Sequence, residues 1–310
     1  SLDRLEPDDL VVTVSLVGAP AALGGSVNPM DYVRSLEMLI SAMDRKPVWL
    51  IQNEMGGLAS ANGLIQSAVV GLPLVDAPCN GRAYPLSVMG SMGLHKRPDY
   101  VAMHAACGGD PKAGRQIEVL VKGGVDQCAA IIQMTSVEAG GLIAVTRNPV
   151  RADWLRENAA PGALTKTINL GWSILKAGAD HIIPAIVEQL GGEVVVSGTV
   201  SKVELTTQGG FDAGQMTFDT GHELAFWNEY ILLEIDGRCL YTFPDLITTF
   251  DSDSNLPVNT ADIKENMSVA VMAAGKEHLA LGTGLLDPDL YRRVKQAVGR
   301  SVIKYAFGGD

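Results

Sequence analysis

The segment from residue 47 to residue 75 constrains the fold more than any other part of the chain. Two short apolar runs, residues 47–51 and 72–75, have the length of buried strands. Between them, apolar side chains recur at helical spacing, and Gly71 supplies a C-terminal stop. A strand, a helix and a second strand joined in this way are expected to place the two strands parallel in one sheet. The segment therefore predicts an α/β domain.

Acidic side chains follow both predicted strands. Glu54 comes shortly after the first run, and Asp76 comes directly after the second. Because the carboxyl ends of neighbouring parallel strands meet at one edge of a sheet, where open α/β sheets bind their ligands, we expect both carboxylates at one candidate site. They could activate a water molecule directly or hold a metal ion that does so. The alternative is that each carboxylate caps the helix or loop that follows it.

The rest of the first 190 residues continues the α/β pattern. We interpret residues 10–17 as a buried strand, residues 116–122 as a short helix and residues 128–135 as a further strand. The last helix of the chain follows Asp287-Pro288, which has the pattern of an N-cap with proline at the first helical position. We expect this helix to pack back on the α/β domain.

At Gly191-Gly192 the composition changes to short β-rich runs separated by Gly, Asp and Asn, with Asp236-Gly237 as a hairpin signal. The predicted fold class is therefore α/β with an insertion. Residues 1–190 together with 279–310 are expected to form a three-layer α/β/α domain. Residues 191–278 are expected to form an inserted all-β, barrel-like domain.

Composition argues against several classes of partner. The net charge of −11 argues against nucleic acid and anionic membranes as partners, because a phosphate-binding surface needs concentrated Lys and Arg. No apolar run is long enough to span a bilayer and no signal-peptide pattern opens the chain, so we expect a cytoplasmic protein. The four cysteines have no CxxC spacing and are expected to be reduced thiols. The glycines at 18, 24 and 25 are too loosely spaced for a nucleotide-binding fingerprint.

Several motifs, most of them in the first third of the chain, resemble a known family. Their residues are Glu54, Gly56-Gly57, Asn62, Gly71-Leu-Pro-Leu-Val-Asp76-Ala, Gly81-Arg82-Ala-Tyr-Pro85 and, much later, Pro244-Asp245-Leu246. Their succession resembles the S-methyl thiohydantoin desulfurase-like family, which often occurs beside hydantoinase or oxoprolinase-type proteins. The resemblance implies a three-layer α/β domain joined to a β-barrel-like domain. Where many members have Asp-Gly-Met before Gly-Arg, this chain has Pro78-Cys79-Asn80. Members also carry a further Gly-rich N-terminal segment, so we expect part of a site to lie on a separate segment.

The resemblance implies a hydrolase-like enzyme that adds water to a ring carbon of a small cyclic nitrogen-containing substrate, of the thiohydantoin or hydantoin type. Glu54, Asp76 and Arg82 are the catalytic candidates, because a planar guanidinium suits a carboxylate or ring carbonyls. The alternative for Arg82 is a buried ion pair with Asp76. The alternative function is a non-catalytic accessory or binding subunit of a hydantoinase or oxoprolinase-type partner. We also expect a homo-oligomer.

Five further residues are candidates for substrate binding: Gly56, Gly57, Asn62, Asn80 and Gly81. The backbone N–H groups of the glycine pair could face an oxyanion, or the pair could serve a turn that needs positive φ. Asn62 could position the ring, or it could be a polar residue on the surface of a helix.

A divalent metal is the only cofactor that the sequence indicates. His104 and Cys107, three residues apart near the end of a predicted strand, form with His95 the best candidate ligand set, although a lone histidine in a strand is more often a core group with satisfied hydrogen bonds. Cys79 could be a thiolate nucleophile, but no histidine lies next to it in the sequence.

Overall fold

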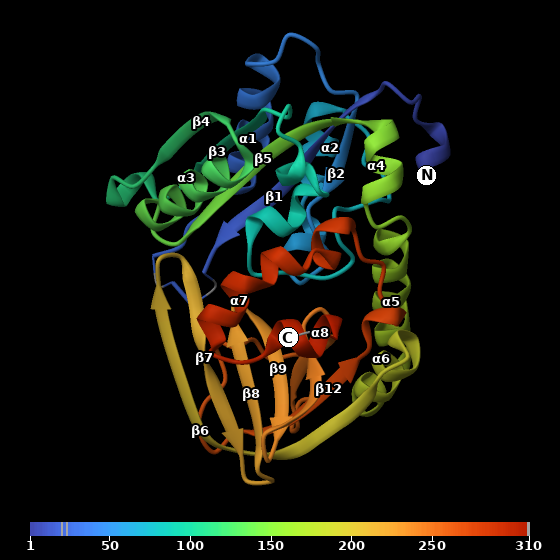
Figure 1. Ribbon diagram of the computed structural model, residues 1–310, viewed down its shortest axis with the longest axis vertical. Helices are drawn as coiled ribbons and strands as arrows, with labels where there is room; N and C mark the ends of the chain where they lie inside the picture. The colour runs from blue at the N-terminus through green and yellow to red at the C-terminus, as the bar shows by residue number, and fades with distance from the viewer. Residues whose placement is uncertain (20, 23, 309–310) are drawn as a thin grey trace. The chain divides into compact units, whose positions relative to one another are not determined.

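The computed structural model describes residues 1–19, 21–22 and 24–308. By its internal contacts the chain divides into two units. Unit 1 comprises Ser1–Leu164 and Ala280–Asp287, and unit 2 comprises Thr165–Leu279 and Pro288–Asp310. The chain therefore leaves unit 1, forms most of unit 2 and returns to unit 1 for a short closing segment (Figure 1).

Unit 1 is built on a mixed five-stranded sheet in the order β2-β1-β5-β3-β4. The strands are β1 (Leu10–Gly18), β2 (Trp49–Gln52), β3 (Ala102–Gly108), β4 (Ile117–Gly123) and β5 (Leu142–Arg151). Strands β1 and β2 are parallel, and the other neighbours are antiparallel. The second predicted run, residues 72–75, joins β2 through one parallel bridge between Leu50 and Leu74. Its parallel direction is confirmed, although the pairing is too short to form a named strand.

Helices cover both faces of this sheet. On one face, Leu36 and Leu39 of α1 (Pro29–Ser41) pack with Val12 and Val14 of β1. On the other face, the side chain of Ile132 in α3 (Val125–Glu138) packs with apolar side chains of β1, β3 and β5. The predicted three-layer α/β/α arrangement is therefore confirmed. The remaining helices of this part of the chain are α2 (Leu64–Val70) and α4 (Ala152–Asn158).

Two predicted elements of unit 1 are wrong. Residues 116–122, predicted as a helix, form β4, in which half-buried and exposed side chains alternate as the period of an edge strand requires. Residues 128–135, predicted as a strand, lie in α3, whose buried side chains recur every three or four residues at Val125, Cys128, Ile132 and Ser136. A short apolar run does not by itself distinguish a buried strand from a buried helix, and here the flanking residues decide.

The helix predicted between the two parallel runs is broken in its middle. A short 3₁₀ segment, η2 (Ala59–Ala61), precedes α2. Gly63 lies between them with φ +82°, and a Cβ at this position would lie 2.6 Å from Leu74 Cδ1. Only glycine fits both this backbone conformation and this close approach, so the chain turns at this residue before α2 begins.

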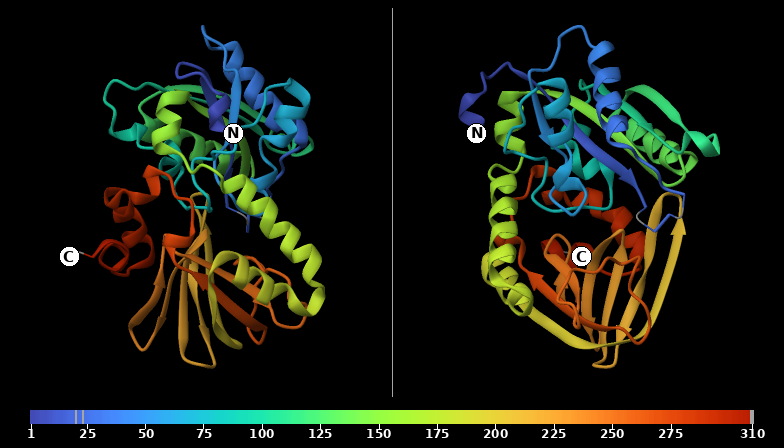
Figure 2. Two further views of the ribbon diagram at one scale, coloured as in Figure 1. Left: turned by 90° about the vertical axis from the view of Figure 1, so that its right-hand side faces the viewer. Right: turned by 180° about the vertical axis from the view of Figure 1, so that it is seen from behind.

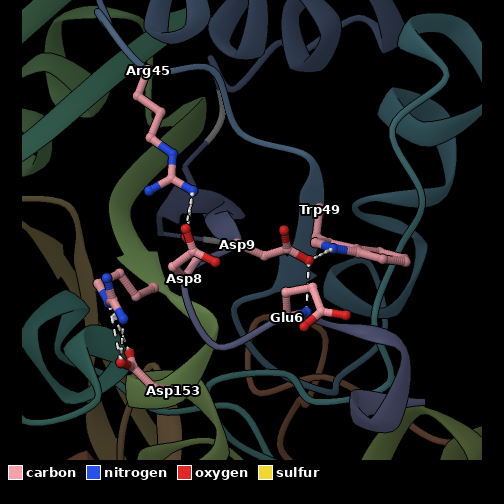
Figure 3. A network of polar contacts seen from close by, with 7 residues as sticks. Glu6, Asp8, Asp9, Arg45, Trp49 and Asp153 are labelled. Atoms are coloured by element: carbon pink, nitrogen blue, oxygen red, sulfur yellow. Dashed lines mark hydrogen bonds and ion pairs between the residues drawn. The ribbon is translucent and has the colours of Figure 1, made fainter.

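A polar network holds the N-terminal segment against the start of β2 (Figure 3). The Asp9 carboxylate accepts hydrogen bonds from Trp49 Nε1 at 2.8 Å and from the Glu6 N–H at 3.0 Å. Arg45 Nη2 donates to the carbonyl oxygen of Asp8 at 2.6 Å. These contacts join the segment before β1 to the residues that lead into β2.

Unit 2 contains a seven-stranded antiparallel sheet in the order β10-β9-β8-β7-β6-β12-β11. The strands are β6 (Glu193–Gln208), β7 (Phe211–Phe218), β8 (His222–Trp227), β9 (Glu229–Ile235), β10 (Arg238–Thr242), β11 (Leu246–Asp251) and β12 (Ser268–Ala274). The sheet is curled, as Figure 2 shows, and encloses a core that contains Phe226, Leu233 and Val271. The predicted barrel-like β insertion is confirmed as a half-barrel.

Four helices belong to unit 2 or begin at its border: α5 (Ala163–Ala177), α6 (Ile182–Leu190), α7 (Tyr291–Val298) and α8 (Val302–Phe307). Helix α6 packs on β12, where Ile186 contacts the cluster around Met272. The final helices, which were expected to pack on the α/β unit, are grouped with unit 2. The Tyr291 ring lies 5.3 Å from the Phe243 ring and 4.8 Å from the Phe307 ring, so α7 and α8 join the β-rich unit.

The boundaries between the two units thus differ from the expected domain boundaries. The expected domains were residues 1–190 with 279–310, and residues 191–278. The composition of residues 165–190 is helical like that of unit 1, but these residues are grouped with the β-rich sheet. Among the described helices, none has both the length and the apolar character needed to cross a membrane.

Candidate functional site

The two predicted catalytic carboxylates have different surroundings. Glu54 is half-buried, forms a parallel bridge with Asn80 and accepts a hydrogen bond from Asn53 Nδ2 at 3.3 Å. Asp76 Oδ1 accepts the N–H of Leu164 at 2.8 Å, in the first turn of α5. The capping contact considered for Asp76 is therefore present, at a helix far along the chain. Its catalytic role stays a prediction, as does that of Glu54.

Asn80 and Gly81 hold the closing segment of unit 1. Asn80 Nδ2 donates to the Met89 carbonyl oxygen at 3.1 Å, and Asn80 Oδ1 accepts the Gly282 N–H at 2.9 Å. The Gly81 N–H donates to the Ala280 carbonyl oxygen at 2.8 Å, and a Cβ at Gly81 would overlap that oxygen. Both ends of the Asn80 amide and the Gly81 N–H are thus engaged within unit 1, which weakens their assignment to substrate.

Arg82 and the glycine pair also have local partners. Arg82 is buried, and its Nε donates to the Ala83 carbonyl oxygen at 2.9 Å. The Gly56 N–H donates to Ser60 Oγ at 3.1 Å. Neither Gly56 nor Gly57 has a positive φ, so the interpretation of this pair as a left-handed turn is wrong. Gly57 is exposed, with no atom within 4 Å of an added Cβ.

Asn62 is not a surface residue, because its side chain is only 3% exposed. Its Nδ2 and Oδ1 atoms have no hydrogen-bond partner in the described part of the chain, and the same holds for Gln52 Oε1 and Gln66 Nε2. The other ends of the two glutamine amides bond to backbone on either side of Asn62, at Ser60 and Gly63. Three buried carboxamides therefore carry unsatisfied atoms within one stretch of chain, which is compatible with the substrate-binding role predicted for Asn62.

Arg147 was not among the residues predicted from the sequence. It is 1% exposed and lies on β5 at the centre of the unit 1 sheet. It pairs with Thr13 of β1 on one side and with His104 of β3 on the other. Arg147 Nη2 donates to Asn53 Oδ1, and Asn53 Nδ2 donates to Glu54 Oε2. An amide thus connects a buried guanidinium to the half-buried carboxylate. An arginine two residues after the apolar run of residues 142–145 was the signal that would have indicated it.

Cys79 and Tyr84 lie near this group and are both buried. Cys79 Sγ is 3.6 Å from Thr13 Oγ1, and burial raises the pKa of the thiol to about 11. The thiol is therefore protonated at neutral pH, which argues against the thiolate nucleophile considered from the sequence. Tyr84 Oη donates to the Asn53 carbonyl oxygen at 3.4 Å, and burial raises the pKa of this phenol well above its usual value.

The side chains of His104 and Cys107, the predicted metal pair, lie on opposite faces of β3 and are not brought together. His104 Nε2 contacts Asn148 Oδ1 at 2.9 Å, on the face of the sheet that carries Arg147. Cys107 Sγ contacts Asp31 Oδ1 of α1 at 3.4 Å, on the other face. Within residues 1–19, 21–22 and 24–308, no group of three or more His, Cys, Asp and Glu side chains could hold a metal ion.

His95, the third member of that set, belongs to a different cluster. Its Nδ1 lies 3.0 Å from Ser91 Oγ, and its Nε2 lies 2.8 Å from Asp287 Oδ2. Lys96 Nζ is also 2.8 Å from Asp287. The order Ser-His-Asp resembles a nucleophilic triad. However, Ser91 is fully buried and could not reach a substrate, so we interpret the cluster as a structural link to the closing segment.

A surface hollow of about 510 Å³ in unit 1 is lined by side chains that include Arg97, Tyr100 and Trp154. None of the predicted site residues lines it. The candidate site therefore rests on the buried polar group around Glu54, Asn53 and Arg147.

An α/β unit with a buried polar centre, interrupted by a β half-barrel, defines the class of this protein. The model of the S-Me-THD-like C-terminal domain matches residues 125–282, and that of the S-Me-THD-like N-terminal domain matches residues 1–114. Together they span most of the chain, which belongs to the S-Me-THD-like family. The gap between the two matched ranges lies inside unit 1.

A crystal structure of a structural-genomics protein from Chromobacterium violaceum has the same fold. It matches with a TM-score of 0.61 and 19% sequence identity, covering 99% of this chain and 85% of that one. A comparison with curated proteins finds no match.

We predict that Gly81→Ala destabilises unit 1 by about 1–3 kcal/mol, because the added methyl group would overlap the Ala280 carbonyl oxygen. Gly57→Ala is the matched control and should change stability by less than about 0.5 kcal/mol. Urea unfolding followed by tryptophan fluorescence measures both. Equal effects of the two substitutions would contradict the close approach at Gly81.

We predict that the low pKa of His104 makes the protein less stable in acid. Burial, and then the charge of Arg147, lower the pKa of His104 from 6.5 to about 3. Between these values the unfolded chain binds a proton that the native protein does not, so the free energy of unfolding falls as pH decreases. The stability of His104→Gln relative to the wild type should rise by about 2 kcal/mol between about pH 7.5 and about pH 5. Unfolding curves at both pH values measure this difference. A difference that does not change with pH would contradict the prediction.

Proposed function

We propose that the protein is a hydrolase-like enzyme that adds water to a ring carbon of a small cyclic nitrogen-containing substrate of the thiohydantoin or hydantoin type. The observation that supports this most is the connection of Glu54 through Asn53 to Arg147, in a chain of the S-Me-THD-like family. It combines a half-buried carboxylate with a fixed positive charge, which are the groups that such a reaction requires.

The proposed reaction begins with attack by water on the ring carbon that carries the substituent. Glu54 accepts a proton as the new carbon–oxygen bond forms, and the ring nitrogen or oxygen takes up the electron pair. The carbon–substituent bond then breaks, the electron pair leaves with the substituent, and the proton held by Glu54 is returned to the leaving group. For an S-methyl thiohydantoin, the products are the hydantoin and methanethiol.

The surroundings of Glu54 suit a general base. Its carboxylate receives a hydrogen bond from Asn53 Nδ2, which fixes its orientation. Nearby Cys79 and Tyr84 are kept protonated by burial, so they do not compete as bases at neutral pH. Asn62 and its neighbouring glutamine amides offer unsatisfied donors and acceptors for the N–H and C=O groups of a ring.

The test is release of thiol from S-methyl thiohydantoin analogues, together with a ring-opening assay on hydantoin. Glu54→Gln should lower kcat/KM by about 10²–10⁴-fold, as expected for loss of a general base. Glu37→Gln, at an exposed residue of α1, is the control and should leave the activity unchanged. Asp76→Asn, whose side-chain oxygen can still accept the Leu164 N–H, tests the second carboxylate, and a loss in it equal to that of Glu54→Gln would support the predicted pairing of the two carboxylates. Full activity of Glu54→Gln would contradict the proposed mechanism.

The second candidate is a binding or accessory role, in which this chain docks a hydantoinase or oxoprolinase-type partner or a second copy of itself. The observation that favours it is an exposed apolar stripe on α5 rather than on the β sheet. Ile168, Trp172 and Leu175 follow one another at helical spacing and are 51%, 57% and 77% exposed. Such a stripe on a helix is typical of an interface.

If copies of the chain associate through this stripe, Trp172→Asp should shift the mass measured by light scattering from oligomer to monomer. Asn169→Asp, on the same helix and also exposed, is the control and should leave the mass unchanged. A wild-type protein that is monomeric at all concentrations would contradict self-association through α5.

A further inference from the structure

Arg147 carries a permanent charge in the interior of unit 1. Its side chain is 1% exposed, and no carboxylate lies within ion-pair distance of it among the described residues. One of its nitrogens donates to Asn53 Oδ1, and its Nε has no partner in that part of the chain. Burying an arginine without a counter-charge is unfavourable, and the guanidinium does not lose its proton to avoid this.

The neighbouring protein groups do not supply the missing negative charge. Cys79 and Tyr84 both interact electrostatically with Arg147, yet burial keeps the thiol and the phenol protonated at neutral pH. Glu54 reaches Arg147 through the Asn53 amide, which accepts a hydrogen bond from Arg147 and donates one to Glu54. A water molecule could accept a hydrogen bond from Nε, but it would leave the charge uncompensated.

A second unsatisfied atom lies beside Arg147. His104 is directly opposite Arg147 in the register of β3 and β5, so both side chains are on the same face of the sheet. His104 Nδ1 is buried without a partner, while Nε2 contacts Asn148 Oδ1 at 2.9 Å. This contact assigns the proton of the neutral ring to Nε2, so Nδ1 is a hydrogen-bond acceptor. Asn148 has φ +52° at the register shift between β1 and β5, where it can reach the ring.

We propose that Arg147 and His104 form a buried site for a small anion that also carries an N–H group. The anion would accept a hydrogen bond from Arg147 Nε and neutralise the guanidinium, and its N–H would donate to His104 Nδ1. A ring imidate and the carboxylate of a ureido acid share this chemistry. The inference rests on the proposed function, because hydantoin, a product of the proposed reaction, is a source of such an imidate, and the ureido acid is the ring-opened form of hydantoin.

The experiment is calorimetric titration of the whole protein with hydantoin, as the source of an imidate, and with N-carbamoylglycine, as the source of a carboxylate. Imidazolidin-2-one has ring N–H groups that are too weakly acidic to form an anion, so it is the control ligand. The variants are Arg147→Met, which removes the charge, and Arg147→Lys, which retains a charge without the planar donor group. Arg151→Met removes a half-exposed arginine from the end of the same strand and is the control variant.

We expect at least one of the two acids to bind the wild type and Arg151→Met equally. Binding to Arg147→Met should be at least tenfold weaker, as loss of a charged hydrogen bond predicts. The acid that binds more tightly identifies the source of the anion. Should Arg147→Met fail to fold, Arg147→Lys provides the same comparison, again with weaker binding. The proposal is overturned if neither acid binds, if imidazolidin-2-one binds as tightly as the acids, or if both Arg147 variants bind like the wild type.

The binding and thiol-release measurements on the same protein distinguish the anion site from the proposed reaction. Thiol release without binding of either acid would refute the anion site and leave the hydrolase proposal standing. Binding that depends on Arg147, without any thiol release or ring opening, would support the anion site and refute the reaction.

Discussion

The buried charge of Arg147 is the constraint on which the centre of unit 1 depends. A guanidinium in the middle of a sheet requires polar neighbours on the adjacent strands, and the register of β1, β5 and β3 places Thr13 and His104 on either side of it. Asn53, just beyond the end of β2, accepts a hydrogen bond from Arg147 and donates another to Glu54. The polar interior and the carboxylate at its border are therefore one connected group. A group of this kind is costly to maintain for stability alone, so a functional reason for it is the simpler explanation.

The residues around this group have two separate tasks. Asp76, Asn80 and Gly81 hold other parts of unit 1 in place, because they bind the start of α5, the segment after Leu86 and the closing segment. The other candidates differ from these anchors. Glu54 is half-buried, and Asn62 and Arg147 are buried with side-chain atoms that have no hydrogen-bond partner in the described part of the chain. Residues 54–81 thus contain both structural anchors and candidates for chemistry, whereas Arg147 comes from β5.

The sequence predicted the parts of the fold that depend on periodicity and on turn residues. The parallel direction of the two runs around residues 50 and 74, the β-rich insertion and the family all follow from such local patterns. Residues 116–122 and 128–135 were assigned the wrong element, because in short segments the choice between strand and helix depends on tertiary contacts. Arg147 was missed for a related reason. Its importance arises from pairing with strands more than forty residues away in the sequence, and its own segment shows only a short apolar run followed by polar and charged residues.

The return of the chain to unit 1 after the insertion has a consequence for synthesis on the ribosome. Residues 280–287 complete unit 1 by contacts with Asn80, Gly81 and His95, but more than one hundred residues of unit 2 emerge before them. The nascent α/β unit therefore remains without this segment until the β-rich insertion has been translated. Completion of unit 1 is thus a late step, which follows the synthesis of most of unit 2.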